Sequence, residues 1–211
     1  AIKGASEILQ TPLSTDKVHR FSANIEREAD RMQSLIDKLL ELARLEKRPQ
    51  LDSLAPINLI DMINQINLAS EVRFVTKSVV CQFDCALSLE KLSNSSVLGD
   101  NFLFQQALFN LMDNAIDFVE PNGTIEWSLL PVKDGLQLAI YNTGPHIPDY
   151  AMARIIERFY SLPRKTGIKS TGLGLNFVEQ VVKLHHGTLN IENVSQGVKV
   201  TLIFPLTANS I

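Results

Sequence analysis

The sequence of 211 residues contains only two cysteines, Cys81 and Cys85, and no run of 18 or more apolar residues. The two cysteines form a C-x3-C pair, and no other Cys or His stands at a spacing from them that is typical of metal ligands. This favours two thiols in a reducing compartment over a metal site. Without a long apolar run, no segment of these residues is expected to span a membrane. The net charge of −3 also lacks the basic excess that would indicate nucleic acid as the main partner.

The charge is unevenly distributed along the chain. Residues 1–50 hold 17 of the 43 charged residues, although they make up only about a quarter of the length. The 45% of hydrophobic residues is too high for a disordered chain and is enough for one or two cores. The contrast predicts two domains of different physical type.

A long helix is predicted in the charge-rich part, because residues 16–48 contain no Gly or Pro and Ser14, Thr15 and Asp16 offer N-cap oxygens. We expect a helical hairpin with a first helix over residues 1–9 and a tight connection at 11–15. The sequence is expected to begin inside this first helix. The apolar residues repeat at alternating steps of three and four, with one break at Glu28, which is a heptad seam; they are Val18, Phe21, Ile25, Met32, Leu35, Leu39 and Leu42. One hairpin cannot cover such a seam, so a homodimeric four-helix bundle is favoured over a monomeric hairpin folded onto the second domain.

After a linker at 49–56, helices alternate with a mostly antiparallel sheet, which predicts an α+β two-layer sandwich. Helices are expected at 59–69, 100–119, 148–159 and 173–185. Strands are expected at 79–87, 124–132, 136–141, 188–194 and 198–204, with turns at 133–135 and 196–197.

Two asparagines, Asn110 and Asn114, stand at i and i+4 of the predicted helix 100–119, so both amides leave the same face. Such a pair suits Mg²⁺ held jointly with phosphates, although two polar residues on a solvated face are the simpler interpretation. The stretch Gly172-Leu173-Gly174-Leu175 opens a helix, where free N–H groups attract phosphate. The basic loop before it, residues 161–171 with Lys169, is typical of a lid or of a solvated loop.

The order of four motifs is more specific than any one of them: N-L-M-D-N-A from Asn110, N-T-G-P-H-I-P from Asn142, E-R-F-Y from Glu157, and G-L-G-L from Gly172. In this order they resemble the ATP-binding domain of bacterial sensor histidine kinases, over residues 55–206. The leading A-I-K-G-A-S-E-I-L and A-R-L-E resemble that family's dimerisation and phosphoacceptor helices. Residues 147–164 resemble one branch of the family especially closely.

The resemblance implies a nucleotide-binding role for residues in each motif. Asn110 and Asn114 would contact Mg²⁺ and phosphate, Asn142 and Gly144 the adenine, and Gly172 to Leu175 with Lys169 the phosphates, with Phe159 at the hinge of the lid. It also implies a homodimer, a response-regulator receiver domain as partner, and the cytoplasmic portion of a bacterial inner-membrane protein, with no nucleic acid and no direct membrane contact. The implied domains are 1–48 (dimerisation and phosphoacceptor), 49–56 (linker), 57–207 (catalytic) and 208–211 (tail).

The sequence departs from the family pattern at three places. The usual Asp of the first glycine box is Asn142, which loses the charge-assisted part of the hydrogen bond to adenine, about 1 kcal/mol or more. The second glycine of that box is His146, which is bulkier and less able to adopt a positive φ. The usual basic residue of the N box is Asp117, which with Asp113 places like charges at i and i+4. The phosphoacceptor box would end just before Ala1, so its His is expected upstream; neither His19 nor the Thr11-Pro12-Leu13 stretch fits that box.

The sequence is compatible with three functions. A histidine kinase core is favoured, and we expect this segment by itself not to autophosphorylate. A degenerate dimeric signalling or phosphatase module is the alternative, supported by Asn142 and His146. A gyrase-like ATPase is disfavoured, because the Glu that such enzymes place four residues before the Mg²⁺-binding Asn is Asn110 here.

Overall fold

The structure is a computed structural model that describes residues 3–4, 6, 14–48, 50–51, 54–85, 97–133, 135–163 and 171–205. The chain divides into two compact units, residues 1–47 and 48–211. Among the described helices, none is long and apolar enough to cross a membrane.

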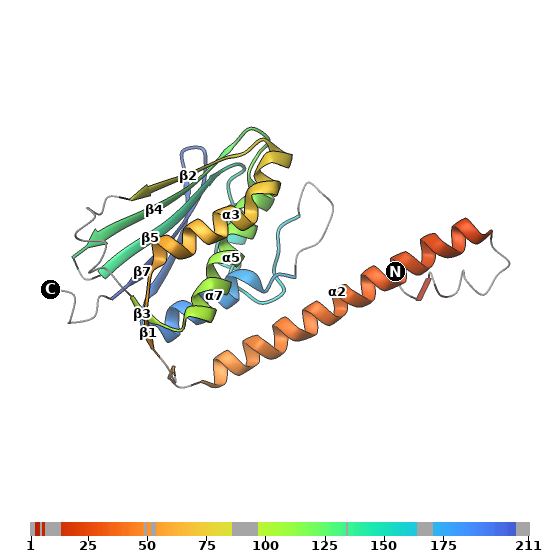
Figure 1. Ribbon diagram of the computed structural model, residues 1–211, viewed down its shortest axis with the longest axis horizontal. Helices are drawn as coiled ribbons and strands as arrows, with labels where there is room; N and C mark the ends of the chain where they lie inside the picture. Colours follow the sequence, from red (N-terminus) through yellow and green to blue (C-terminus); the bar gives the residue numbers. More distant parts are fainter. Residues whose placement is uncertain are drawn as a thin grey trace. The chain divides into compact units, whose positions relative to one another are not determined.

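The first unit is dominated by one helix, α2 (Thr15–Lys47) (Figure 1). It begins where the N-cap oxygens predict, with the Val18 N–H donating to the Ser14 carbonyl at 3.1 Å. Most of the predicted first helix and of the connection at 11–15 lies outside the described residues, although Lys3, Gly4 and Ser6 are helical.

The apolar stripe of α2 is broader than the predicted seam. Met32, Ile36 and Leu40, which are 54%, 48% and 53% exposed, follow one another at steps of four. The seam residues Phe21, Leu35 and Leu39 are half-buried. A helix with this much exposed apolar surface is stable only when something covers it.

The second unit is a two-layer sandwich, as predicted. Its main sheet has the order β2-β4-β5-β7-β6, and helices α3, α5 and α7 lie together on one face of the sheet (Figure 1). The strands are β2 (Val80–Cys85), β4 (Thr124–Val132), β5 (Gly135–Thr143), β6 (Thr188–Val194) and β7 (Gly197–Phe204). Only the β2–β4 pair among them is parallel, so the sheet is mostly antiparallel.

Helix α3 (Leu59–Lys77) extends beyond the predicted end at residue 69. Asn58 caps its start, accepting the N–H groups of Ile60 and Asp61 at 3.1 and 3.2 Å. The helix continues because Ser70 and Phe74 carry on its buried stripe, and it ends at Ser78, whose left-handed backbone has φ 54°.

The indole of Trp127, on β4, is fully buried and ties α3 to the sheet. Its Nε1–H donates to Asn67 Oδ1 at 3.1 Å, and the Cys81 thiol reaches the same oxygen at 3.5 Å. Burial raises the pKa of Cys81 to about 11, so the thiol stays protonated at neutral pH.

Two further features differ from the sequence-based expectations. A small antiparallel sheet pairs β1 (Ala55–Ile57) with β3 (Val97–Gly99); strands of three residues show too little alternation to be predicted. The helix expected at 148–159 is wrong beyond its first turn, because α6 covers only Asp149–Met152. Bonds between residues three apart then lead to Phe159, whose φ of 64° is incompatible with a continuing helix.

Candidate functional site

Helix α5 (Asn101–Phe118) carries the two asparagines singled out in the sequence. Asn110 and Asn114 are both half-buried. The Asn110 Nδ2–H donates to the Gln106 carbonyl at 3.0 Å, which fixes the amide with its oxygen directed away from that carbonyl. A Cβ added at Gly174 would lie 3.2 Å from Asn110 Oδ1. The structure therefore brings Asn110 and the second glycine turn together.

The second glycine turn lies directly against Phe159. Gly172 has a φ of 66°, and a Cβ at this position would meet the Phe159 carbonyl carbon at 2.5 Å. The Phe159 N–H donates to the Gly172 carbonyl at 2.9 Å. This bond joins the two ends of the loop 160–171, most of which, including Lys169, lies outside the described residues.

Helix α7 (Gly174–Leu184) starts immediately after this turn without a side-chain cap. Leu173, the residue before it, is 2% exposed, whereas Gly174 and Leu175 are half-buried. Uncapped N–H groups at a helix start favour a negatively charged ligand.

The end of β5 places Asn142 and Gly144 beside the last turn of α5. Asn142 is 9% exposed, and its Nδ2–H donates to the Thr143 carbonyl at 3.2 Å. A Cβ at Gly144 would lie 2.4 Å from the Phe118 carbonyl oxygen, so only glycine permits this approach. One of the two Nδ2–H donors of Asn142 is thus used within the loop, and Oδ1 is available as an acceptor in addition.

His146 is an exposed loop residue. Its Nε2 lies 2.7 Å from the Val194 carbonyl oxygen. The neighbouring Ile147 exchanges two hydrogen bonds of 2.9 Å with the Asn193 side chain, and the Gly144 N–H donates to the Gln196 carbonyl. The loop of the first glycine box is therefore fixed to the β6–β7 hairpin.

The carboxylates of Asp113 and Asp117 share a positively charged partner, which reduces the repulsion between them. Arg73, from α3, forms an ion pair with Asp113 through Nη1, and its Nη2 lies 3.8 Å from Asp117 Oδ1. The expected cost of like charges is therefore offset by a cation that sequence spacing did not reveal.

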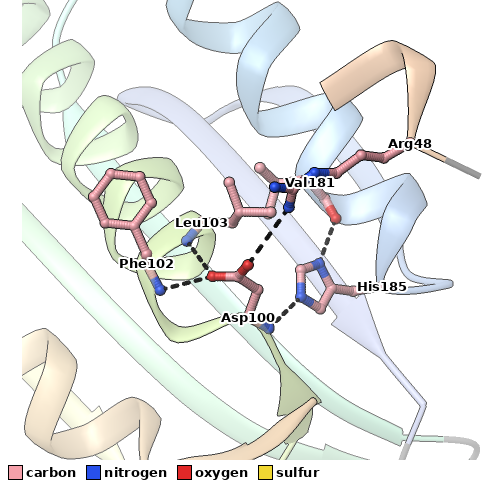
Figure 2. A network of polar contacts seen from close by, with 6 residues as sticks. All are labelled: Arg48, Asp100, Phe102, Leu103, Val181 and His185. Atoms are coloured by element: carbon pink, nitrogen blue, oxygen red, sulfur yellow. Dashed lines mark hydrogen bonds and ion pairs between the residues drawn. The ribbon is translucent and has the colours of Figure 1, made fainter. Parts of the chain in front are cut away.

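A polar network connects the N-terminus of α5 with the end of α7 (Figure 2). Asp100 Oδ1 accepts the N–H groups of Phe102 and Leu103 at 3.0 and 3.2 Å, and Arg48 lies 3.9 Å from its other oxygen. The Asp100 N–H donates to His185 Nε2 at 3.0 Å. Burial lowers the pKa of His185, although a backbone hydrogen bond to Val181 and the charge of Asp100 act in the opposite direction.

Comparison with known proteins decides the family. Residues 99–208, over half of the chain, match the model "Histidine kinase-, DNA gyrase B-, and HSP90-like ATPase". The chain belongs to this ATPase family. Residues 1–48 match the "His Kinase A (phospho-acceptor) domain". Together the two matches give the chain the domain composition of a histidine kinase core, as the four motifs predicted.

The sensor protein CreC of Escherichia coli K12 is 39% identical over 197 residues, which cover 93% of this chain and 40% of that protein. The chain spans less than half the length of the first curated relatives that it matches. Among solved structures, full-length ShkA with AMPPNP has a TM-score of 0.75 at 23% identity, covering 100% of this chain and 43% of ShkA. The histidine kinase ThkA with the response regulator TrrA has a TM-score of 0.75 at 22% identity, covering 98% and 57%.

Two residues of the second unit were not found by sequence reasoning. Arg73 gave no signal, because its partners lie 40 residues away in sequence. Asn176 follows G-L-G-L and is 9% exposed; its Nδ2–H donates to the Ile156 carbonyl at 3.1 Å, and its Oδ1 has no hydrogen-bond partner among the residues that the structure describes. A polar residue at this step of an otherwise apolar helix face was the available signal.

Proposed function

We propose that this chain is the catalytic core of a sensor histidine kinase and binds ATP between α5, the end of β5 and the start of α7. The observation that carries the proposal is the contact between Asn110 and Gly174. In this contact the amide oxygen of Asn110 lies beside an uncapped helix N-terminus, and this combination suits a nucleotide polyphosphate. The AMPPNP in the ShkA structure supports the same conclusion.

The donor set fits Mg²⁺ held together with phosphates. Asn110 and Asn114 would hold the ion through neutral amide oxygens, and the nucleotide would supply the negative charge that such a pair lacks. Bound there, Mg²⁺ would neutralise charge on the phosphates. The start of α7, with Gly172, Leu173, Gly174 and Leu175, would orient them, and Lys169 would approach from the loop that Phe159 and Gly172 close.

Asn142 would recognise the base. One Nδ2–H of Asn142 donates to the Thr143 carbonyl, and Oδ1 would accept a hydrogen bond from the 6-amino group of adenine. Gly144 would let the base approach the backbone. The neutral amide gives up the charge-assisted part of this hydrogen bond, so we expect the affinity for ATP to be modest.

The proposed reaction transfers the γ-phosphoryl group of ATP to a histidine of the phosphoacceptor domain and then to an aspartate of a response-regulator receiver domain. The protein's contribution would be positioning and charge neutralisation. The match to the phospho-acceptor domain and the ThkA–TrrA complex support these partners. The exposed apolar stripe of α2 supports a homodimer, and the likeness to the sensor protein CreC supports a parent protein with a sensor role. That this parent protein is anchored in the membrane is part of the same proposal.

A degenerate signalling or phosphatase module is the second candidate, because Asn142 and His146 replace residues of the first glycine box. Calorimetry of this chain with Mg²⁺–ATP separates the two functions. A kinase core should bind Mg²⁺–ATP, and the full-length protein should incorporate acid-labile phosphate from ATP. No heat of binding with this chain, but clear binding by Asn142→Asp, would instead favour the degenerate module.

A further inference from the structure

The phosphate-facing side of α5 carries acidic as well as amide groups. Asn110, Asp113, Asn114 and Asp117 follow one another at steps of three, one and three, so they form one continuous stripe on the helix. The side chains of Asp113 and Asp117 are 51% and 23% exposed. Two uncompensated carboxylates beside the asparagine pair would repel a nucleotide polyphosphate.

Arg73 brings a positive charge to these carboxylates from a different helix. Its guanidinium contacts Asp113 and lies 3.8 Å from Asp117, while the side chain remains 43% exposed. The Asp117 distance is an ion-pair distance rather than a close hydrogen bond. A guanidinium has five N–H donors and matches phosphate oxygens well, so two carboxylates at these distances do not exhaust it.

The neighbouring basic residue of α3, Lys77, donates to the Ile116 carbonyl, a backbone group of α5, and so joins the two helices. Arg73 forms ion pairs with the side chains of Asp113 and Asp117 in the Asn110–Asp117 stripe. Exposed ion pairs contribute only about 0–1 kcal/mol to stability, so folding alone gives little reason for an arginine at this place.

We propose that Arg73 is a further determinant of nucleotide affinity in this protein: it offsets Asp113 and Asp117 and thereby lets the Asn110–Asn114 face accept the phosphate chain. The proposal rests on the proposed function, because it assigns a residue to the same nucleotide site. The effect of Arg73 should therefore grow with the number of phosphates on the ligand and vanish for adenosine.

The test compares Arg73→Gln and Arg73→Lys with the unmodified chain by calorimetry, using ATP, ADP, AMP and adenosine at constant Mg²⁺. Arg73→Gln is expected to weaken ATP binding about tenfold, which corresponds to the loss of one charge-assisted contact. ADP should lose less and adenosine nothing. Arg73→Lys keeps the charge and should stay within about threefold of the unmodified chain.

Lys183→Gln is the matched control. Lys183 forms an exposed ion pair of 2.9 Å with Glu179 on α7, so its loss removes one positive charge and one ion pair outside the Asn110–Asp117 stripe. It should leave all four affinities unchanged. Equal losses for ATP and adenosine in Arg73→Gln, or no loss for ATP, would overturn the proposal while leaving the nucleotide site in place. If the unmodified chain binds none of the four ligands, the proposed function itself fails and Arg73 loses its role with it.

Discussion

At the scale of single residues, the first glycine box shows how one atom changes a predicted affinity. Asn142 occupies the place where the family resemblance expects an aspartate, and its amide is oriented by the Thr143 carbonyl. The residue keeps the acceptor and loses the charge. Gly144, two residues further along the chain, lies close against the Phe118 carbonyl oxygen, so the shape of the box is retained.

We predict that Asn142→Asp binds Mg²⁺–ATP about five- to tenfold more tightly than the unmodified chain, because a charged acceptor makes a stronger hydrogen bond to an amino group. Calorimetry with adenosine should show a similar gain, since the contact is to the base. Inosine, which has no 6-amino group, is the control ligand and should gain nothing. A gain for ATP without a gain for adenosine would place Asn142 away from the base.

A second residue-scale prediction concerns Gly172. Alanine there must adopt a φ of 66°, and its Cβ would approach the Phe159 carbonyl carbon to 2.5 Å. We expect Gly172→Ala to lower the free energy of unfolding by about 1–3 kcal/mol, measured by urea denaturation. Gly4→Ala, where nothing lies within 4 Å of the added Cβ, should be neutral or stabilising. An equally stable Gly172→Ala would show that the turn can rearrange.

At the scale of elements, the network around His185 joins the end of α7, the start of α5 and strand β3 (Figure 2). The imidazole accepts the Asp100 N–H, and its Nδ1 lies 2.7 Å from the Val181 carbonyl oxygen. This arrangement requires the neutral ring, because a protonated ring has no acceptor nitrogen. The Phe104 ring, 4.4 Å away between centroids, adds an apolar contact.

Because burial lowers the pKa of His185, the unfolded chain takes up a proton before the folded chain does as the pH falls. The contribution of His185 to stability is therefore complete above about pH 6.5, its ordinary value, and is lost progressively below it. We predict that the free energy of unfolding falls less steeply between pH 6.5 and 5 in His185→Gln than in the unmodified chain. His19→Gln, at an exposed position of α2, should keep the steep fall; identical slopes in all three proteins would contradict the assignment.

Elements with local signals at both ends were predictable from sequence. Strand β6 was expected at 188–194 and has these bounds, because Gly187 precedes it and the Gln196-Gly197 turn follows. The segment 148–159 was not predictable, because the conformation of Phe159 depends on its hydrogen bond to Gly172, which is distant in sequence. Arg73 was not predicted for the same reason, because its partner Asp113 is also distant in sequence. The nucleotide-binding roles of Asn110, Asn114, Asn142 and the glycines stay predictions.

At the scale of the whole molecule, the uneven charge noted in the sequence corresponds to two units of different construction. The second unit buries its own core, including Trp127, Phe104 and Phe204. The first unit exposes Met32, Ile36 and Leu40 along α2. Apolar surface of this kind on a charge-rich helix indicates a partner, and a second copy of the same helix is the simplest partner with a matching stripe.

We predict that Ile36→Glu and Leu40→Glu, alone or combined, convert a dimer of this chain into a monomer, because each places a charge in the exposed apolar stripe of α2 that the proposed four-helix bundle would cover. Sedimentation velocity over a range of concentrations measures the change. Asp37→Lys is the control for altered charge. Asp37 follows Ile36 in the sequence, and its carboxylate accepts a hydrogen bond from the Gln33 side chain. This variant should remain dimeric. The second unit should keep its ATP affinity in every variant, since its core does not depend on α2 of a partner. A monomeric unmodified chain at high concentration would contradict dimerisation through these residues, and dimers that persist in the double variant would place the interface on another face of the molecule.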